Sequence, residues 1–151
     1  MYWTSYSGFI LQGGMDGSNV RTLISGLVQP CGIQFYAGTN RLYWVEEGGQ
    51  KFKSSNDQGA DIRILVNTLE RPFGMAVLND QIFWGHYNSR PIVRGTITGQ
   101  DRVVVFNGAG DVKQFDVPNG ISATSRMNPC ESQNCSSICV LTPAMSGRCL
   151  G

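Results

Sequence analysis

The chain of 151 residues is poor in charge, has a single histidine and lacks any long apolar run. Its twelve Lys and Arg residues are balanced by eleven Asp and Glu residues and form no basic run, so we do not expect nucleic acid as a partner. No stretch of about 18 apolar residues is present, so we expect no membrane insertion in this segment. The first residues have neither the basic start nor the apolar core of a signal peptide, so an extracellular protein would need a leader upstream.

Motifs of catalysis are also missing. The sequence has no P-loop, no Gly-x-Ser-x-Gly motif and no His-Glu-x-x-His motif. Its acidic residues, such as Asp16, Asp57 and Asp80, fall mostly in expected turns and do not converge on one position. We therefore expect a protein that is not an enzyme and that holds no metal and no cofactor.

What the sequence does contain is a threefold repeat with a period of about 40 residues. An aromatic pair marks each unit, at Tyr2-Trp3, Tyr43-Trp44 and Phe83-Trp84, and these are the only three tryptophans. A unit of this length with one aromatic pair is typical of a four-stranded propeller blade. Bulky rings at one position of every unit indicate a core role for Trp3, Trp44 and Trp84 rather than a functional one.

Turn residues divide each unit into short strands. We expect strands in the middle unit at residues 32–36, 42–45, 51–54 and 62–66, and in the third unit at 74–78, 81–84, 92–97 and 102–106. The first unit begins in its second strand, and residues 111–117 alternate like one more inner strand. This predicts an all-β fold of about three blades. Because propellers typically have four to eight blades, we expect the remaining half-propeller, or a second copy of the chain, as a partner.

The cysteines are unevenly distributed. Cys31 stands alone in the repeats, whereas four cysteines crowd between positions 130 and 149. Clustered cysteines in a short segment rich in Asn and Ser favour a disulfide-stapled module. A zinc site is the alternative, but the spacing and the lack of a nearby histidine fit it poorly. The expected organisation is blades at 1–117, a linker at 118–127 and a small Cys-rich module at 128–151.

Several motifs resemble the low-density-lipoprotein receptor family. Tyr2-Trp3-Thr4-Ser5 is similar to the YWTD, or class B, repeat of that family, and residues 15–19 are similar to its Leu-Asp-Gly-Ser-Asn turn. Residues 27–33 and 69–75 resemble its Leu-x-x-Pro-x-Gly-Leu entry into the inner strand. Residues 128–149 resemble the EGF-like module that follows such propellers. The resemblance covers nearly the whole chain.

The resemblance implies the C-terminal half of a six-bladed YWTD propeller with a partial EGF-like tail. Family members are cell-surface receptors whose propellers bind protein ligands or drive their release in acidic endosomes. The implied function is therefore a non-catalytic, extracellular protein-binding module of an endocytic or signalling receptor. A structural spacer without a ligand is the alternative, and a calcium-dependent propeller hydrolase is a third, weaker one.

The resemblance also suggests how the tail is bridged and modified. It implies the pairs Cys130–Cys139 and Cys135–Cys149, with the third bridge of an EGF-like module missing, and no calcium-binding pattern precedes Cys130. Asn134-Cys135-Ser136 fits the N-glycosylation pattern, although a bridged cysteine in the middle makes it a poor acceptor. Cys31 is expected to be a buried free thiol or to pair with a residue outside this sequence.

Candidate ligand-binding residues lie at the end of the YWTD motif. Its fourth position, usually an Asp that ties neighbouring blades by hydrogen bonds in the family, is Ser5, Glu46 and His86 here. Equivalent positions face the ligand side in the family, which yields five candidates: Tyr6, Glu46, Glu47, His86 and Tyr87. Aromatic rings beside carboxylates suit a partner that carries Lys or Arg, and the alternative is a solvated loop edge. The pKa of an unperturbed histidine suits acid sensing by His86, and the alternative is a loop histidine bonded to the backbone.

Overall fold

A computed structural model describes residues 1–86, 91–107, 138–141 and 147–150 of the chain. Within these ranges the fold is all-β, as predicted, and contains no helix that could cross a lipid bilayer. The chain divides into two compact units. One comprises residues 2–11 and 22–117, and the other comprises Met1, residues 12–21 and residues 118–151.

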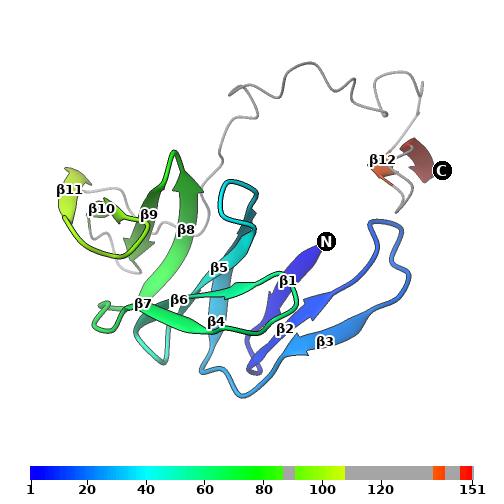
Figure 1. Ribbon diagram of the computed structural model, residues 1–151, viewed down its shortest axis with the longest axis horizontal. Helices are drawn as coiled ribbons and strands as arrows, with labels where there is room; N and C mark the ends of the chain where they lie inside the picture. The colour runs from blue at the N-terminus through cyan, green and yellow to red at the C-terminus, as the bar shows by residue number, and fades with distance from the viewer. Residues whose placement is uncertain (87–90, 108–137, 142–146, 151) are drawn as a thin grey trace. The chain divides into compact units, whose positions relative to one another are not determined.

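Three successive sheets, called blades 1 to 3 below, account for residues 2–106 (Figure 1). Blade 1 has the order β1 (Tyr2–Ser5), β2 (Phe9–Gln12), β3 (Arg21–Ile24). Blade 2 has the order β4 (Pro30–Tyr36), β5 (Arg41–Glu46), β6 (Lys51–Asn56), β7 (Arg63–Val66). Blade 3 has the order β8 (Pro72–Leu78), β9 (Gln81–His86), β10 (Ile92–Thr96), β11 (Val103–Phe106). The predicted succession of three, four and four strands is confirmed, and the strand expected at 111–117 lies outside the described residues.

The same backbone turn recurs before the outer strand of every blade. Gly17, Gly59 and Gly99 have φ values of 81°, 77° and 81°, which favour glycine. Two residues later, Asn19, Asp61 and Asp101 also have positive φ values, of 52°, 51° and 50°. The repeat seen in the sequence is therefore a repeat of backbone conformation, and the turn residues are chosen for it.

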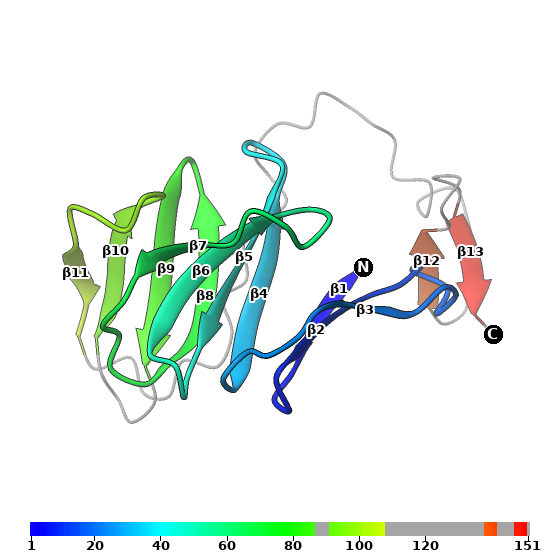
Figure 2. The same cartoon turned by 60° about the horizontal axis from the view of Figure 1, so that its bottom comes forward.

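Blades 2 and 3 lie directly against each other, with β4 beside β8 (Figure 2). Gln34 on β4 donates a hydrogen bond to the main-chain oxygen of Val77 on β8 at 3.0 Å and accepts one from its N–H at 2.7 Å. Gly32 permits this approach, because a Cβ there would lie 2.9 Å from the main-chain oxygen of Phe73. At the outer edge, Gly99 packs so closely on the carbonyl of Leu65 in blade 2 that a Cβ would overlap it.

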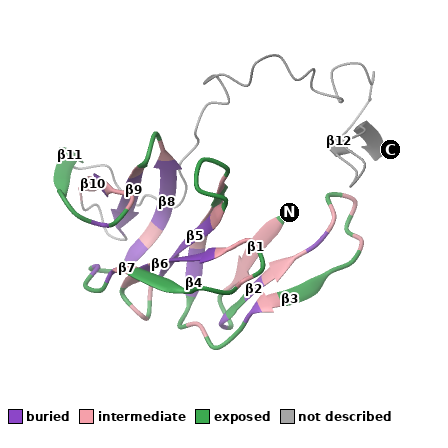
Figure 3. Ribbon diagram, in the orientation of Figure 1, coloured by how far each residue is buried: buried purple, intermediate pink, exposed green. Residues whose placement is uncertain are grey.

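The core lies between the blades, where β5, β8 and β9 are most deeply buried (Figure 3). Trp44 and Trp84 are fully buried, and the ring of Trp84 meets that of Phe52 edge-on with centroids 6.4 Å apart. Trp3 is only half-buried. The predicted core role is thus confirmed for Trp44 and Trp84.

The second unit includes a short antiparallel pair, β12 (Ile138–Leu141) and β13 (Gly147–Leu150), whose register sets Cys139 opposite Cys149. Cys130, Cys135 and Asn134 lie outside the described residues. The two expected disulfides, the EGF-like module and the glycosylation site therefore stay predictions.

Candidate functional site

Blades 2 and 3 are built in the same way at one end, where two equivalent segments of each blade meet. The second strand of the blade ends there, and the chain from the preceding blade enters there through a proline. Glu46 at the end of β5 is paired with Pro30, and His86 at the end of β9 is paired with Pro72. Glu46 and His86 therefore occupy equivalent positions, which we call the corners of blades 2 and 3.

The corner of blade 2 holds a buried carboxylate. Glu46 is 1% exposed, and its Oε1 accepts a hydrogen bond from Nε1 of Trp44 at 3.2 Å and lies 2.7 Å from Nζ of Lys53. Its Oε2 accepts a hydrogen bond from the main-chain N–H of Val28 at 3.2 Å. Because Val28 lies in the segment that connects blade 1 to blade 2, Glu46 makes the inter-blade tie that the resemblance assigns to Asp.

The corner of blade 3 holds the only histidine. His86 is buried, and its Nδ1 donates a hydrogen bond to the main-chain oxygen of Glu70, in the segment that connects blade 2 to blade 3. A carbonyl can only accept, so the neutral ring carries its proton on Nδ1. Burial holds the pKa of His86 below its usual value, because the charged ring is poorly solvated there.

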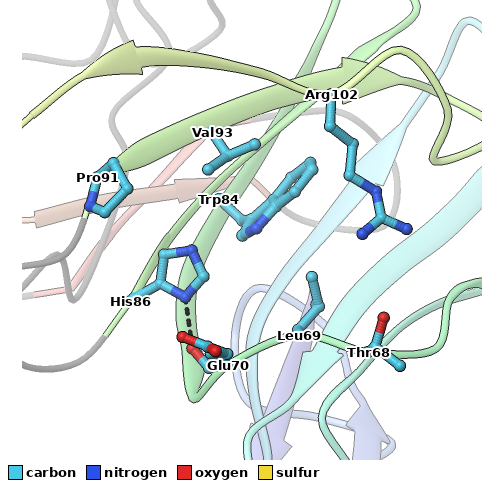
Figure 4. A pocket seen from close by; sticks show the side chains of 8 residues that line it. All are labelled: Thr68, Leu69, Glu70, Trp84, His86, Pro91, Val93 and Arg102. Atoms are coloured by element: carbon cyan, nitrogen blue, oxygen red, sulfur yellow. Dashed lines mark hydrogen bonds between the residues drawn. The ribbon is translucent and has the colours of Figure 1, made fainter.

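Beside His86 lies a pocket of about 320 Å³ (Figure 4). Its lining combines apolar, cationic and acidic side chains: Thr68, Leu69, Glu70, Trp84, His86, Pro91, Val93 and Arg102. The ring of Trp84 and the side chain of Val93 form apolar walls, and the guanidinium of Arg102 points towards Leu69 and Thr68. Sequence reasoning gave no hint of this pocket.

A chain of polar contacts, called the Tyr6 patch below, joins Tyr6, Glu47 and Arg71. The hydroxyl of Tyr6 donates a hydrogen bond to Oε2 of Glu47 at 2.8 Å, and Oε1 of Glu47 lies 3.2 Å from the guanidinium of Arg71. The hydrogen bond to this carboxylate raises the pKa of the Tyr6 hydroxyl. Tyr6 follows β1, Glu47 follows β5 and Arg71 precedes β8, so the patch crosses all three blades.

Sequence comparisons relate the chain to large receptors. It is 28% identical to the vitellogenin receptor of Solenopsis invicta over 146 residues, which is 93% of this chain and 8% of the receptor. It is also 28% identical to the human low-density lipoprotein receptor-related protein 5 over 137 residues, which is 89% of the chain and 8% of that protein. The vitellogenin receptor Yl of Drosophila melanogaster is 26% identical over an alignment of 164 positions, which covers 97% of this chain and 8% of that receptor. No family model matches the chain.

Solved structures agree on the architecture. The chain superposes on a structure of the nidogen/laminin complex with a TM-score of 0.69 and 22% identity, covering 76% of this chain and 48% of that one. The fold is a YWTD β-propeller. A luciferin-regenerating enzyme also matches, with a TM-score of 0.57 and 15% identity over 76% of the chain. The resemblance to the low-density-lipoprotein receptor family is confirmed by the receptor matches, of which the chain spans only about a twelfth.

The YWTD propeller brings together only part of the predicted ligand set. Tyr6 and Glu47 are in contact, and Tyr87 lies outside the described residues. Glu46 and His86, which the sequence also predicts to face a partner, are buried, and the carboxylate of Glu46 is bonded to Trp44 and Lys53. The side chain of Glu47 is also only 11% exposed, whereas that of Arg71 is 55% exposed and its chain neighbour Glu70 is exposed too.

The sequence analysis did not predict two residues near the corners of blades 2 and 3, although the repeats contain a signal for both. Arg71 stands before Pro72 as Gln29 stands before Pro30, and both have positive φ values, of 45° and 51°. Lys53 stands opposite Trp44 in the strand pairing, and Trp44 lies two residues before the corner residue Glu46. The alignment of the repeats could have marked both as corner residues.

The lone thiol of the propeller, Cys31, is buried at the start of β4. Its Sγ lies 3.5 Å from the main-chain oxygen of Pro72, and burial raises its pKa to about 11. A thiol with so high a pKa is protonated at neutral pH and is a poor nucleophile. Among the described residues no group of three acidic, His or Cys side chains could hold a metal ion.

Proposed function

We propose that this chain is a non-catalytic, extracellular protein-binding module of an endocytic or signalling receptor, and that it binds its ligand through the Tyr6 patch. The proposal rests chiefly on the contact chain from Tyr6 through Glu47 to Arg71 across three blades. Tyr and Arg are enriched among residues that dominate binding energy. A tyrosine whose hydroxyl is already fixed also loses little freedom when a partner covers it.

The exposed groups of the patch indicate the chemistry of the ligand. Tyr6 is 53% exposed and offers an aromatic face, and Arg71 offers a half-exposed guanidinium. Glu47 is occupied by both of them and serves to hold them in place. An acidic ligand surface with an apolar side chain suits this combination better than the basic ligand expected from the sequence.

The nature of the relatives suggests the first ligand to test. Two of the matched proteins are insect vitellogenin receptors, so we propose a large secreted lipoprotein of the vitellogenin kind. The receptor relatives support a further part of the proposal, that the chain belongs to an ectodomain that passes through endosomes, where acidification would promote release. The buried His86 supports release, because charging it in its present site is unfavourable.

Surface plasmon resonance of the immobilised chain against purified insect vitellogenin tests this function. Tyr6→Ala and Arg71→Ala are expected to weaken binding at pH 7.4 by at least about tenfold, as hot-spot residues do. Tyr6→Phe keeps the ring but releases Glu47, so we expect a smaller loss. Phe106→Ala removes an aromatic of similar exposure outside the patch and serves as the matched control. Equal effects of the patch variants and the control would refute the assignment.

A structural spacer is the second candidate. The observation that favours it is that the corner carboxylate and Glu47 are both used inside the propeller. A chain that folds cleanly yet binds no vitellogenin at pH 7.4 or pH 5.5 would support the spacer. In either case we propose that further blades, from the same protein or a second copy, complete the ring. Light scattering that gives twice the mass of the chain would support the second copy.

A further inference from the structure

The corners of blades 2 and 3 differ in one respect that changes their chemistry. In blade 2, Lys53 stands opposite Trp44 in the strand pairing, and its amine lies 2.7 Å from Oε1 of Glu46, the oxygen that accepts the hydrogen bond from the indole N–H. In blade 3, the residue opposite Trp84 is Val93, which has no charged group. Val93 and Trp84 both line the pocket of about 320 Å³ described above.

The corner of blade 3 also has a histidine in place of the carboxylate residue Glu46 of blade 2. Nε1 of Trp44 donates to Glu46, but the equivalent residue for Trp84 is His86, which donates to the main chain of Glu70 instead. Among the residues that the structure describes, none accepts a hydrogen bond from the indole N–H of Trp84. The side chain of Trp84 is only 2% exposed, but its Nε1 is not among the buried polar atoms that lack a partner, so the N–H is reached by solvent. A donor that has no protein acceptor and is reached by solvent can donate to an acceptor on a ligand.

We infer that this pocket receives a carboxylate group from the bound protein ligand, in the place that Glu46 takes in blade 2. The N–H of Trp84 would donate to one oxygen and the guanidinium of Arg102 would pair with the group, while Val93 and Leu69 enclose its methylene carbons. Since pockets of about 300 Å³ are at the small end of ligand sites, a single acidic side chain fits better than a larger group. This inference rests on the proposed function and identifies a second contact for the same ligand.

One group in the pocket acts against an anion. The side chain of Glu70 lies among the lining residues, and its charge opposes a second carboxylate nearby. Replacing Glu70 by Gln removes that repulsion without changing the main-chain oxygen that His86 uses. The inference therefore predicts opposite effects for two neighbouring substitutions, with Arg102→Gln weakening carboxylate binding and Glu70→Gln strengthening it.

Titration of the ¹⁵N-labelled chain with short peptides tests the pocket directly. The chain has three indole N–H signals, one for each tryptophan, and Trp84→Phe assigns that of Trp84. Acetyl-Gly-Glu-Gly-amide is expected to shift the Trp84 signal saturably with a millimolar Kd, while the Trp44 signal stays still because Glu46 already occupies its donor. The amide analogue acetyl-Gly-Gln-Gly-amide is the matched control and is expected to bind at least about tenfold more weakly.

Sodium acetate distinguishes a free carboxylate from a protein side chain. If acetate shifts the Trp84 signal but the glutamate peptide does not, the assignment to a ligand side chain is overturned. No shift with either probe, or equal shifts with the glutamate and glutamine peptides, overturns the inference as a whole. The expected order of peptide affinity is Glu70→Gln above wild type above Arg102→Gln, and any other order contradicts the proposed geometry.

The double variant His86→Glu/Val93→Lys transfers the Glu–Lys pair of blade 2 into blade 3 and closes the pocket. We expect it to abolish the peptide shift and to weaken vitellogenin binding at least about tenfold, while Phe106→Ala leaves both unchanged. Vitellogenin binding that depends on Tyr6 but survives this double substitution would refute the pocket and leave the proposed function standing. If the double variant does not fold, the peptide titrations of Arg102→Gln and Glu70→Gln still decide the question.

Discussion

Replacing Glu46 by alanine is expected to lower the free energy of unfolding more than the same substitution at any other acidic residue of blades 1 to 3. The substitution removes the counter-charge of Lys53, which is itself only 15% exposed, at a distance of 2.7 Å. It also removes the acceptor used by Nε1 of Trp44 and by the main-chain N–H of Val28. One of these links runs within blade 2, and the other ties blade 2 to the chain leaving blade 1.

The magnitude follows from what is left behind. Removing one partner of a buried ion pair costs about 3–5 kcal/mol, because the other charge stays buried. Each donor that loses its acceptor contributes about 1–3 kcal/mol when water cannot replace it. Lys53 keeps some exposure, so we expect a total near the lower end, about 3–5 kcal/mol. In a chain of this size that corresponds to a fall in Tm of roughly 6–20 °C.

Urea unfolding of the wild type and of three variants measures this loss. Glu46→Gln keeps one acceptor oxygen but not the charge, and is expected to lose about 1–3 kcal/mol. Glu46→Leu/Lys53→Met removes both charges and is expected to recover most of the loss of Glu46→Ala, since apolar replacements of buried pairs are often neutral. A Glu46→Ala loss below about 0.5 kcal/mol, or a double variant no better than the single one, would refute the reasoning.

The remaining predictions concern the turns, the blade contact and the histidine. Gly17→Ala and Gly99→Ala both put alanine at a φ of 81°, but only Gly99 lies against the preceding blade, so its substitution should lower Tm at least twice as much as that of Gly17; equal losses would contradict the packing. Gln34→Ala is expected to cost about 2 kcal/mol in chemical unfolding, because both main-chain groups of Val77 lose their partner. The folded pKa of His86 is lowered, so the unfolded chain takes up the proton first; stability is fully present above about pH 6.5 and is lost as the pH falls from there towards the folded pKa. His86→Gln should flatten this part of the pH profile, and an unchanged profile would show that His86 does not cause it.

The sequence was sufficient for the fold because the repeat constrains it several times over. Gly59 and Gly99 mark the same turn in blades 2 and 3, and Trp44 and Trp84 mark the same strand position in their cores. Alternation alone gives strand ends that differ from the structure by one or two residues: the inner strands, for example, begin at Pro30 and Pro72 rather than at the following glycines. The prolines belong to the strands because their missing N–H falls at the strand start, where no ladder bond is needed.

The site was predicted less well because sequence position does not determine which way a side chain points. Glu46 and Glu47 are adjacent, so one faces the core and the other the loop, and only the strand pairing decides which. The pocket of blade 3 arises from a difference between repeats, Lys53 against Val93, rather than from a motif. An alignment of the repeats shows the difference itself, but the pocket beside Trp84 becomes visible only in three dimensions.

The central claim is that the Tyr6 patch binds a secreted protein. The most direct test is the affinity of the chain for insect vitellogenin at pH 7.4, measured side by side for wild type, Tyr6→Ala, Arg71→Ala and the control Phe106→Ala. The account predicts that both patch variants bind at least about tenfold more weakly and that the control binds as the wild type does. Wild-type binding that survives both patch substitutions, or no binding at all, would contradict it.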